Sequence, residues 1–360
     1  MKRFLIPLLC LSVSGGLCSQ EVPKSGEPGT PAPSEAAQAK WSAIAKEVME
    51  AMKKEDTAKA FSLAQKGADA GDLDCVFFLG RMLENGWGTK ADPAGAVAGY
   101  AKAAAKDHEE ARANWARCLE SGIGGKADPE KADFLYQQAA EAGFVSAQSR
   151  MGVLEMDGIR RPKNEKAAFE WFVKAAAQND GVAFYRLAQC YQHGLGGVEK
   201  SVAKALENAM KGANAGNLDA VNQVGLYYQY GYGLKQDKIA AAGWFNFAAQ
   251  YDHPAALSNL GQCYEAGQGF KPNLKTAARI YADAAKLNDP FGCLNLARCL
   301  KDGLGVEKHL GNAYVNFARA ALLGIKAAEP LRDEVKAKLS PAELKEAEAL
   351  LQKITGKGAS

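Results

Sequence analysis

The chain has 360 residues, of which 48% are hydrophobic and 24% charged, an ordinary balance for a soluble globular protein. Its formal net charge is +3, and Lys2 and Arg3 contribute to it, so the rest of the chain is close to neutral. It therefore lacks the basic surface with which proteins bind nucleic acid or an anionic membrane. Abundant alanine and glycine, with proline densest near the N-terminus, favour closely packed helices over sheets.

Residues 1–19 have the pattern of a secretory signal peptide. A basic start precedes an apolar run from Phe4 to Val13, which is too short to span a bilayer. We expect cleavage close to Cys18 and an exported mature protein, either periplasmic or secreted. Lipid anchoring at Cys18 is disfavoured because Leu17, rather than a small residue, precedes it.

Residues 20–40 are rich in Pro, Gly, Ser and Glu and contain few side chains that could form a core. This composition predicts a flexible linker. Such a linker would hold the folded part of the chain away from the membrane or the point of secretion.

A repeat of about 36 residues runs through the rest of the chain. Seven segments align, with starts at Cys75, Ala111, Ala147, Ala183, Ala220, Ala256 and Gly292. Four residues after each start comes a large apolar residue, then Gly or Ala, and two glycines follow eleven and thirteen residues after the start. Only the third segment departs from the glycine pattern, with Arg160. Two helical patterns separated by a Gly-rich turn at a fixed period predict a helix–turn–helix solenoid.

The repeat positions indicate how these helices would pack. The small residue after the large one would let the second helix approach closely, and the first glycine suits the left-handed backbone at a helix end. We expect residues 41–74 to form a degenerate N-terminal repeat, residues 75–328 seven full repeats, and residues 329–360 C-terminal capping helices. In the last part, Ser340 as N-cap and Pro341 at the first helical position predict a helix start.

The fifth segment carries the most complete motif. Its residues at the repeat positions are Ala220, Gly225, Tyr228, Gly231, Gly233, Asp237, Lys238, Ala241, Trp244, Phe245, Ala248 and Ala249. This pattern resembles the Sel1-like repeat, a relative of the tetratricopeptide repeat. The resemblance extends over the seven segments and implies an all-α, right-handed α-solenoid of helix–turn–helix repeats with helical caps.

Four tyrosines lie close together between residues 227 and 232. Tyr228 falls on the aromatic position of the repeat and is expected to be buried. Tyr227 stands where other segments carry cysteine, so it is expected to be packed. Tyr230 and Tyr232 have no expected structural role, which leaves them available to a ligand.

Six cysteines follow the signal peptide, and we expect them to be reduced. Four of them share one repeat position: Cys118, Cys190, Cys263 and Cys299. Equivalent points on neighbouring repeats lie about 8–10 Å apart, whereas a disulfide needs Cα atoms within about 7 Å. Some secreted Sel1-like proteins have a disulfide between the two helices of a repeat. That bridge requires a cysteine on the second helix, and no segment here has one. The cysteines are expected to act as small buried apolar residues.

No set of residues fits a catalytic, metal or cofactor site. The chain has four histidines: His108, His193, His253 and His309. They lack the spacing of metal ligands, and the first and third share a turn position that predicts helix capping. Ser201 and Lys204 form the Ser-x-x-Lys pair of serine penicillin-recognising enzymes, but the companion motifs are absent.

The candidate site lies on the first helices of the central repeats. In tetratricopeptide relatives these helices line the concave surface, which by resemblance places positions two, six, nine and ten of each segment inward. The central segments gather amide and aromatic side chains there: Tyr185, Gln189, Gln192, His193, Asn222, Gln229 and Tyr230. Such side chains suit hydrogen bonding to an extended peptide or a glycan, and an ordinary solvated helix face is the competing interpretation.

These features predict a non-enzymatic scaffold for protein–protein interaction, acting in the cell envelope or outside the cell. The expected partner is an extended protein or peptide segment on the concave face, with no role for nucleic acid and no transmembrane segment. A peptidoglycan- or cell-wall-binding module is the alternative, because the same side chains suit glycan or stem peptide. An enzyme that recognises or hydrolyses β-lactams is the third and weakest interpretation.

Overall fold

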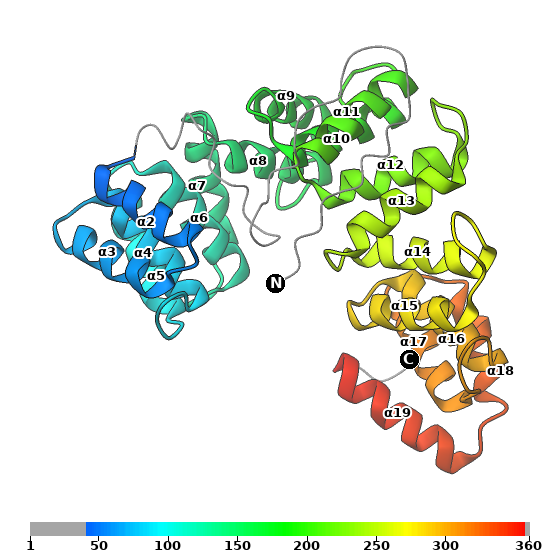
Figure 1. Ribbon diagram of the computed structural model, residues 1–360. Helices are drawn as coiled ribbons and strands as arrows, with labels where there is room; N and C mark the ends of the chain where they lie inside the picture. The colour runs from blue at the N-terminus through cyan, green and yellow to red at the C-terminus, as the bar shows by residue number, and fades with distance from the viewer. Residues whose placement is uncertain (1–40, 357–360) are drawn as a thin grey trace.

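The computed structural model describes residues 41–356 as a curved stack of helix pairs (Figure 1). The expected signal peptide at residues 1–19 and linker at residues 20–40 lie outside the described residues. Within the described range every regular element is an α-helix, as the repeat pattern predicts. None of these helices combines the length and the hydropathy needed to cross a bilayer.

The helices alternate between a first and a second helix of each pair. The first helices are α2 (Ala43–Lys53), α4 (Leu73–Asn85), α6 (Glu109–Ser121), α8 (Val145–Asp157), α10 (Gly181–His193), α12 (Leu218–Tyr230), α14 (Pro254–Ala266) and α16 (Pro290–Asp302). The second helices are α3 (Thr57–Asp69), α5 (Pro93–Ala104), α7 (Pro129–Glu141), α9 (Glu165–Ala176), α11 (Val202–Asn214), α13 (Lys238–Ala249), α15 (Leu274–Lys286) and α17 (Leu310–Leu322). Two further helices, α18 (Ala328–Lys336) and α19 (Pro341–Thr355), follow.

Side-chain caps fix where most helices begin. The histidines at the shared turn position cap as predicted: Nδ1 of His108 accepts from the backbone N–H of Ala111 at 3.2 Å, and Nδ1 of His253 accepts from Ala256 at 3.1 Å. His309 caps α17 in the same way, which the sequence pattern did not reveal. These caps satisfy backbone N–H groups that have no partner inside the helix.

The two turn glycines have different tasks. The first ends each first helix in the left-handed conformation, as Gly86 does at φ 71°, which confirms the sequence prediction. The second packs against the previous repeat: a Cβ on Gly305 would lie 2.1 Å from the carbonyl oxygen of Leu274. Arg160, in the place of this glycine, adopts φ 60° and pairs with Asp133 of the previous repeat instead.

On four first helices a glycine receives a ring from the second helix of the same pair: Gly80, Gly152, Gly225 and Gly261. A Cβ on Gly152 would lie 2.4 Å from a ring carbon of Phe172, and one on Gly261 would lie equally close to Tyr281. Both rings are fully buried. The expected close approach of the two helices is therefore confirmed, and the approach depends on the missing side chain.

All six cysteines within the described residues are free and buried, in agreement with the prediction of reduced thiols. Burial raises the pKa of the Cys118, Cys190 and Cys263 thiols to about 11. A thiol with so high a pKa stays protonated at neutral pH and is a poor nucleophile. The cysteines are therefore core residues.

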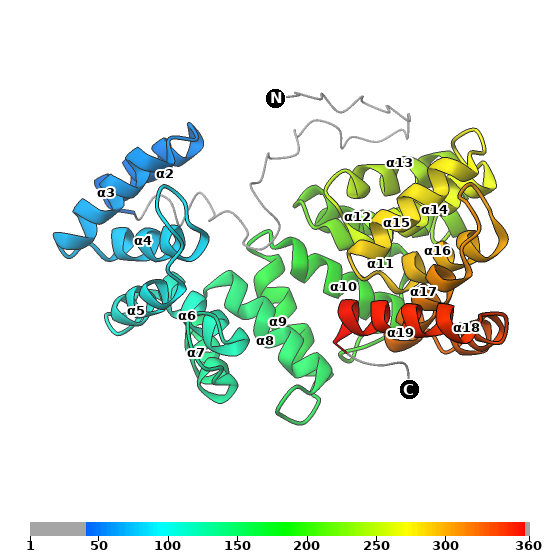
Figure 2. The same ribbon diagram turned by 90° about the horizontal axis from the view of Figure 1, so that it is seen from below.

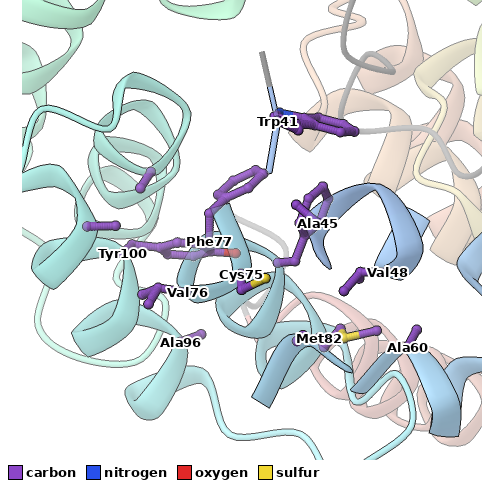
Figure 3. Packing of buried hydrophobic residues seen from close by; sticks show 14 of the residues in the cluster. Trp41, Ala45, Val48, Ala60, Cys75, Val76, Phe77, Met82, Ala96 and Tyr100 are labelled. Carbon is purple, nitrogen blue, oxygen red and sulfur yellow. The ribbon is translucent and has the colours of Figure 1, made fainter. Parts of the chain in front are cut away.

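Both ends of the stack are covered. At the N-terminal end Trp41 packs edge-on against Phe78 with ring centroids 4.9 Å apart, over the cluster that includes Phe77 and Tyr100 (Figure 3). At the other end α18 and α19 lie against α17 (Figure 2). Ser340 begins α19 with a capping box, which confirms the predicted helix start.

The prediction for the tyrosine-rich stretch was partly wrong. Tyr227 is only 2% exposed, as expected, but Tyr232 is not free, because its ring stacks on Tyr227 with centroids 5.1 Å apart. Tyr228, which was expected to be buried, is only half-buried and packs against the clusters of two neighbouring repeats. Tyr230 remains 71% exposed.

Candidate functional site

The first helices form the inner side of the curve. Within the described residues α2 contacts α4, α10 contacts α12 and α14 contacts α16, whereas no two second helices between α3 and α17 make comparable contact. The shorter separation lies on the concave side of a curved stack, and Figure 1 shows α8 and α10 inside α9 and α11 at the top of the arc. The first helices therefore line the inner face.

Three repeats carry the same polar module on this face. The hydroxyl of Tyr100 on α5 donates to Glu84 on α4 at 3.0 Å, and Arg117 on α6 donates to both oxygens of Glu84 at 2.6 Å. Each carboxylate thus joins a buried tyrosine of its own repeat to an arginine of the next. We call this the Tyr–Glu–Arg module, and its members are Tyr100–Glu84–Arg117, Tyr136–Glu120–Arg150 and Tyr281–Glu265–Arg298.

The buried ring and the residue at position nine vary together along the stack. Where the second helix carries Tyr, position nine is Glu; where it carries Phe or Ala, position nine is another residue. The four exceptions to the module are Phe172 with Met156, Ala209 with Gln192, Phe245 with Gln229, and Phe317 with Lys301. Repeats three to five consequently form a continuous stretch in which the carboxylate is missing.

On α10 three side chains of this stretch form a short network. Nη1 of Arg186 donates to Oε1 of Gln189 at 3.1 Å, and Nε2 of Gln189 donates to the hydroxyl of Tyr185 at 3.0 Å. The guanidinium carbon of Arg186 also lies 5.8 Å from the ring centre of Tyr185. Burial raises the pKa of Tyr185, and the nearby negative charge of Asp219 adds to this effect, so the tyrosine stays neutral and can donate or accept hydrogen bonds.

The amides of α12 connect to both neighbouring first helices. Oε1 of Gln192 on α10 accepts from the hydroxyl of Tyr227 at 2.8 Å and from Gln223 at 3.4 Å. Asn222 is buried and its Oδ1 accepts from Asn259 on α14 at 2.9 Å. These bonds replace the ion pairs of the outer repeats, so the centre of the inner face is held together by uncharged groups.

Gln229 differs from the other amides. Among the described residues its buried Oε1 has no hydrogen-bond donor, because Phe245 lacks the hydroxyl that a tyrosine would supply from the second helix. A buried acceptor without a donor carries a desolvation cost. At the end of the same helix Tyr230 extends its ring into solvent.

A charged cluster borders this uncharged stretch on the N-terminal side. Asp133 accepts from Arg160 and lies 3.5 Å from Arg161, while Arg160 also reaches Glu120 at 3.1 Å. These ion pairs raise the pKa of Arg160. The cluster neutralises its own charges and links repeats two and three, so it is part of the scaffold.

The structure separates the seven residues of the predicted site into two groups. Tyr185, Gln189, Gln192 and Asn222 are held by hydrogen bonds within or between first helices. The other three are less constrained: Gln229 lacks a donor for its Oε1, and His193 and Tyr230 are exposed. All seven lie on α10 and α12.

Sequence reasoning missed position three of each segment. Arg186 and Gln223 occupy it on α10 and α12, and both hydrogen-bond to predicted site residues. Position three lies one helical turn before position six, on the same face of the helix. This spacing was visible in the sequence.

The Ser-x-x-Lys pair has a structural task. Ser201 is the N-cap of α11, and its hydroxyl accepts from the backbone N–H of Lys204 at 3.3 Å. The ammonium group of Lys204 lies over the ring of Tyr191, 5.2 Å from its centre. No group of three or more potential metal ligands occurs among residues 41–356.

A pocket lies between α13, α14 and α15. Its lining includes Leu257, Leu260 and Tyr264 of α14 and the charged side chains of Arg279 and Asp283 of α15. None of the residues of the predicted site lines it.

Comparison with known proteins identifies the repeat. The family model described as the Sel1 repeat matches eight segments: residues 50–72, 73–108, 109–144, 145–180, 182–217, 218–251, 254–289 and 290–325. The last seven segments begin one or two residues before the repeat starts given in the sequence analysis. The first segment covers the end of α2 and the whole of α3.

Two solved structures resemble the chain along most of its length. One is a protective antigen of uropathogenic Escherichia coli strains that displays an SLR fold; it is 29% identical, with a TM-score of 0.65, and the match covers 84% of this chain. The chain spans 65% of that protein. The other is a Sel1 repeat protein from Oxalobacter formigenes, 24% identical with a TM-score of 0.55, where the match covers 83% of this chain and 92% of that one.

Proposed function

Because the chain belongs to the Sel1 repeat family, we propose that it is a non-enzymatic scaffold that binds an extended polypeptide on the inner face of α10 and α12. Sel1 repeat proteins commonly mediate protein–protein interaction. Stacked helix pairs present an extended concave surface, which suits an extended partner.

One observation carries this proposal. In repeats one, two and six the Tyr–Glu–Arg module pairs the polar groups of the inner face, whereas repeats three to five lack the carboxylate and α10 and α12 carry amides and tyrosines on this face. Amides can donate and accept hydrogen bonds at once, as the backbone of an extended chain requires. The unsatisfied Oε1 of Gln229 and the exposed ring of Tyr230 lie on this same stretch.

We propose further that the protein acts in the cell envelope or outside the cell. The basic and apolar pattern of residues 1–19 supports export.

A capture experiment with matched variants tests the binding face. The Gln189→Ala/Tyr230→Ala variant removes an amide and an exposed tyrosine from the inner face. The control, Gln250→Ala/Tyr251→Ala, removes an exposed amide and a 56% exposed tyrosine at the turn after α13. Equal amounts of folded protein, checked by circular dichroism, are compared. We expect the inner-face variant to lose the envelope proteins that the unmodified chain retains, and the control variant to keep them. The reason is that aromatic side chains at interface centres contribute about 2 kcal/mol or more to binding.

Two results would contradict the proposal. Equal retention by both variants would show that the partner binds elsewhere. If no protein is retained but purified sacculi sediment with the chain, the cell-wall interpretation, which the same amides and tyrosines suit, replaces the scaffold. A nitrocefin assay on the same samples tests the enzymatic alternative, with Ser201→Ala as its control.

A further inference from the structure

Arg186 occupies the same repeat position as Arg150, but no carboxylate among the described residues pairs with it. Arg150 stands at position three of the third segment and pairs with Glu120, at position nine of the second. Arg186 stands at position three of the fourth segment. The corresponding position nine of the third segment is Met156, which is 9% exposed and carries no charge.

Within residues 41–356 no carboxylate forms an ion pair with Arg186. Among the described residues no acidic oxygen lies within ion-pair distance of its guanidinium group, and its recorded hydrogen bond goes from Nη1 to the neutral Gln189. Asp219, which interacts with the charge of Arg186 but forms no ion pair with it, is hydrogen-bonded to Nε2 of His253 at 3.2 Å. That hydrogen bond is the main cause of the lowered pKa of Asp219, and the charge of Arg186 is a lesser one.

The other arginines on this face show what is missing. Arg117 contacts Glu84 at 2.6 Å, Arg150 contacts Glu120, and Arg298 lies 3.6 Å from Glu265. Arg186 is partly buried like Arg117 and Arg150, and its Nε is likewise buried without an acceptor. A partly desolvated guanidinium favours a carboxylate, because the planar group can donate two parallel hydrogen bonds to it.

The guanidinium is also held in place. Gln189 binds Nη1, and the hydroxyl of Tyr185 in turn receives a hydrogen bond from Gln189. Among residues 41–356 Nη2 has no hydrogen-bond acceptor, and it is not fully buried, so it can be reached from solvent. An arginine fixed in this way loses less side-chain entropy on binding than a free one.

We propose that Arg186 binds an acidic side chain, Asp or Glu, of the extended polypeptide on the inner face. Because Met156 fills the position that corresponds to Glu120, the partner's carboxylate approaches Arg186 from the solvent side of the inner face. A side chain is favoured over a chain terminus because the inner face continues on both sides of α10, along α8 and along α12. This inference rests on the proposed function and adds a sequence preference to it.

The experiment uses arrays of decapeptides that are blocked at both ends, so that a terminal carboxylate cannot contribute. The flanking positions are randomised among uncharged residues, and a central position is Glu in one pool and Gln in the other. We expect the unmodified protein to retain the Glu pool at least about tenfold better than the Gln pool, the lower limit for a charge-assisted pair. Arg186→Gln should retain both pools equally, whereas the control Arg298→Gln, which removes an arginine that already has a carboxylate, should keep the preference.

A second variant keeps Arg186 but provides a carboxylate from the chain itself to pair with it. Met156→Glu with Phe172→Tyr rebuilds the Tyr–Glu–Arg module in the third repeat, and we expect it to lose the Glu preference while it stays folded. A preference that survives in this variant, or in Arg186→Gln, overturns the assignment. Equal retention of both pools by the unmodified protein overturns the assignment but leaves the scaffold proposal intact, and retention of neither pool contradicts both.

Discussion

The Tyr–Glu–Arg module predicts energetic coupling between a tyrosine and a glutamate that lie on different helices. In the first repeat the hydroxyl of Tyr100 donates to Glu84, whose side chain is only 12% exposed. Burial raises the pKa of Tyr100, so the phenol keeps its proton and remains a donor at neutral pH. Tyr100→Phe removes only this donor, because the ring still fills the space beside Gly80.

The expected magnitude follows from the charge of the acceptor. A hydrogen bond to an ionised group stabilises a fold by about 1.5–3 kcal/mol, and one to a neutral group by about 1 kcal/mol. We therefore expect Tyr100→Phe to lower the free energy of unfolding by about 2 kcal/mol in the unmodified chain but by about 1 kcal/mol when Glu84 is replaced by Gln. The double variant resembles the fifth repeat, where Gln229 faces Phe245, and the coupling energy is about 1 kcal/mol.

The assay is urea denaturation of the four proteins of this double-mutant cycle, followed by circular dichroism. Repeat arrays can unfold in parts, so hydrogen exchange of the α4 and α5 amides should report the same differences locally. The pair Tyr281 and Glu265, with an O–O distance of 2.6 Å, provides a second cycle. If the two substitutions are additive within about 0.3 kcal/mol in both cycles, the covariation of ring and carboxylate has no energetic basis.

Two further predictions concern the thiols and the exceptional turn. Burial raises the pKa of the Cys293 and Cys299 thiols to about 11 and that of the Cys75 thiol to about 12. Iodoacetamide at pH 8 should therefore leave the six cysteines after residue 40 unmodified in the folded protein and modify all six in guanidinium chloride. Peptide mass spectrometry that finds a disulfide or a labelled site in the folded chain would contradict this. Arg160→Gly should lower the free energy of unfolding by about 1 kcal/mol. The two charge-assisted bonds to Asp133 contribute about 1.5–3 kcal/mol, whereas glycine relieves about 1–2 kcal/mol of left-handed backbone strain. A gain in stability in urea denaturation would show that strain dominates.

The fold could be predicted because its determinants are local and recur. The glycine that ends each first helix and the capping residue that begins the next helix act within a few residues of chain. The small residue that receives a ring, such as Gly152 with Phe172, acts within one repeat. Seven copies of the same pattern make each of these signals visible above chance.

The site was less predictable because its contacts cross between repeats. Gln192 was expected to face the partner, yet its Oε1 accepts from the hydroxyl of Tyr227 of the next repeat. Asn222 was expected to face the partner and is instead buried against Asn259 of the next repeat. Such contacts depend on the rotation between successive repeats, which a repeat alignment does not contain.

Paired and unpaired polar groups occupy different parts of the inner face, which suggests different roles in stability and in binding. Removing one member of a buried polar pair leaves the other member desolvated and without a partner. The third repeat lacks both the glutamate at position nine and the tyrosine that would donate to it, and carries Met156 and Phe172 instead. The arginine that belongs to this pair, Arg186, has nevertheless remained charged, and Gln189 satisfies only one of its donors. A residue that served stability alone would gain from a carboxylate at position 156. The structure therefore favours an interpretation in which the carboxylate is supplied from outside the chain, and in which the uncharged stretch from α8 to α12 binds the polypeptide that carries it.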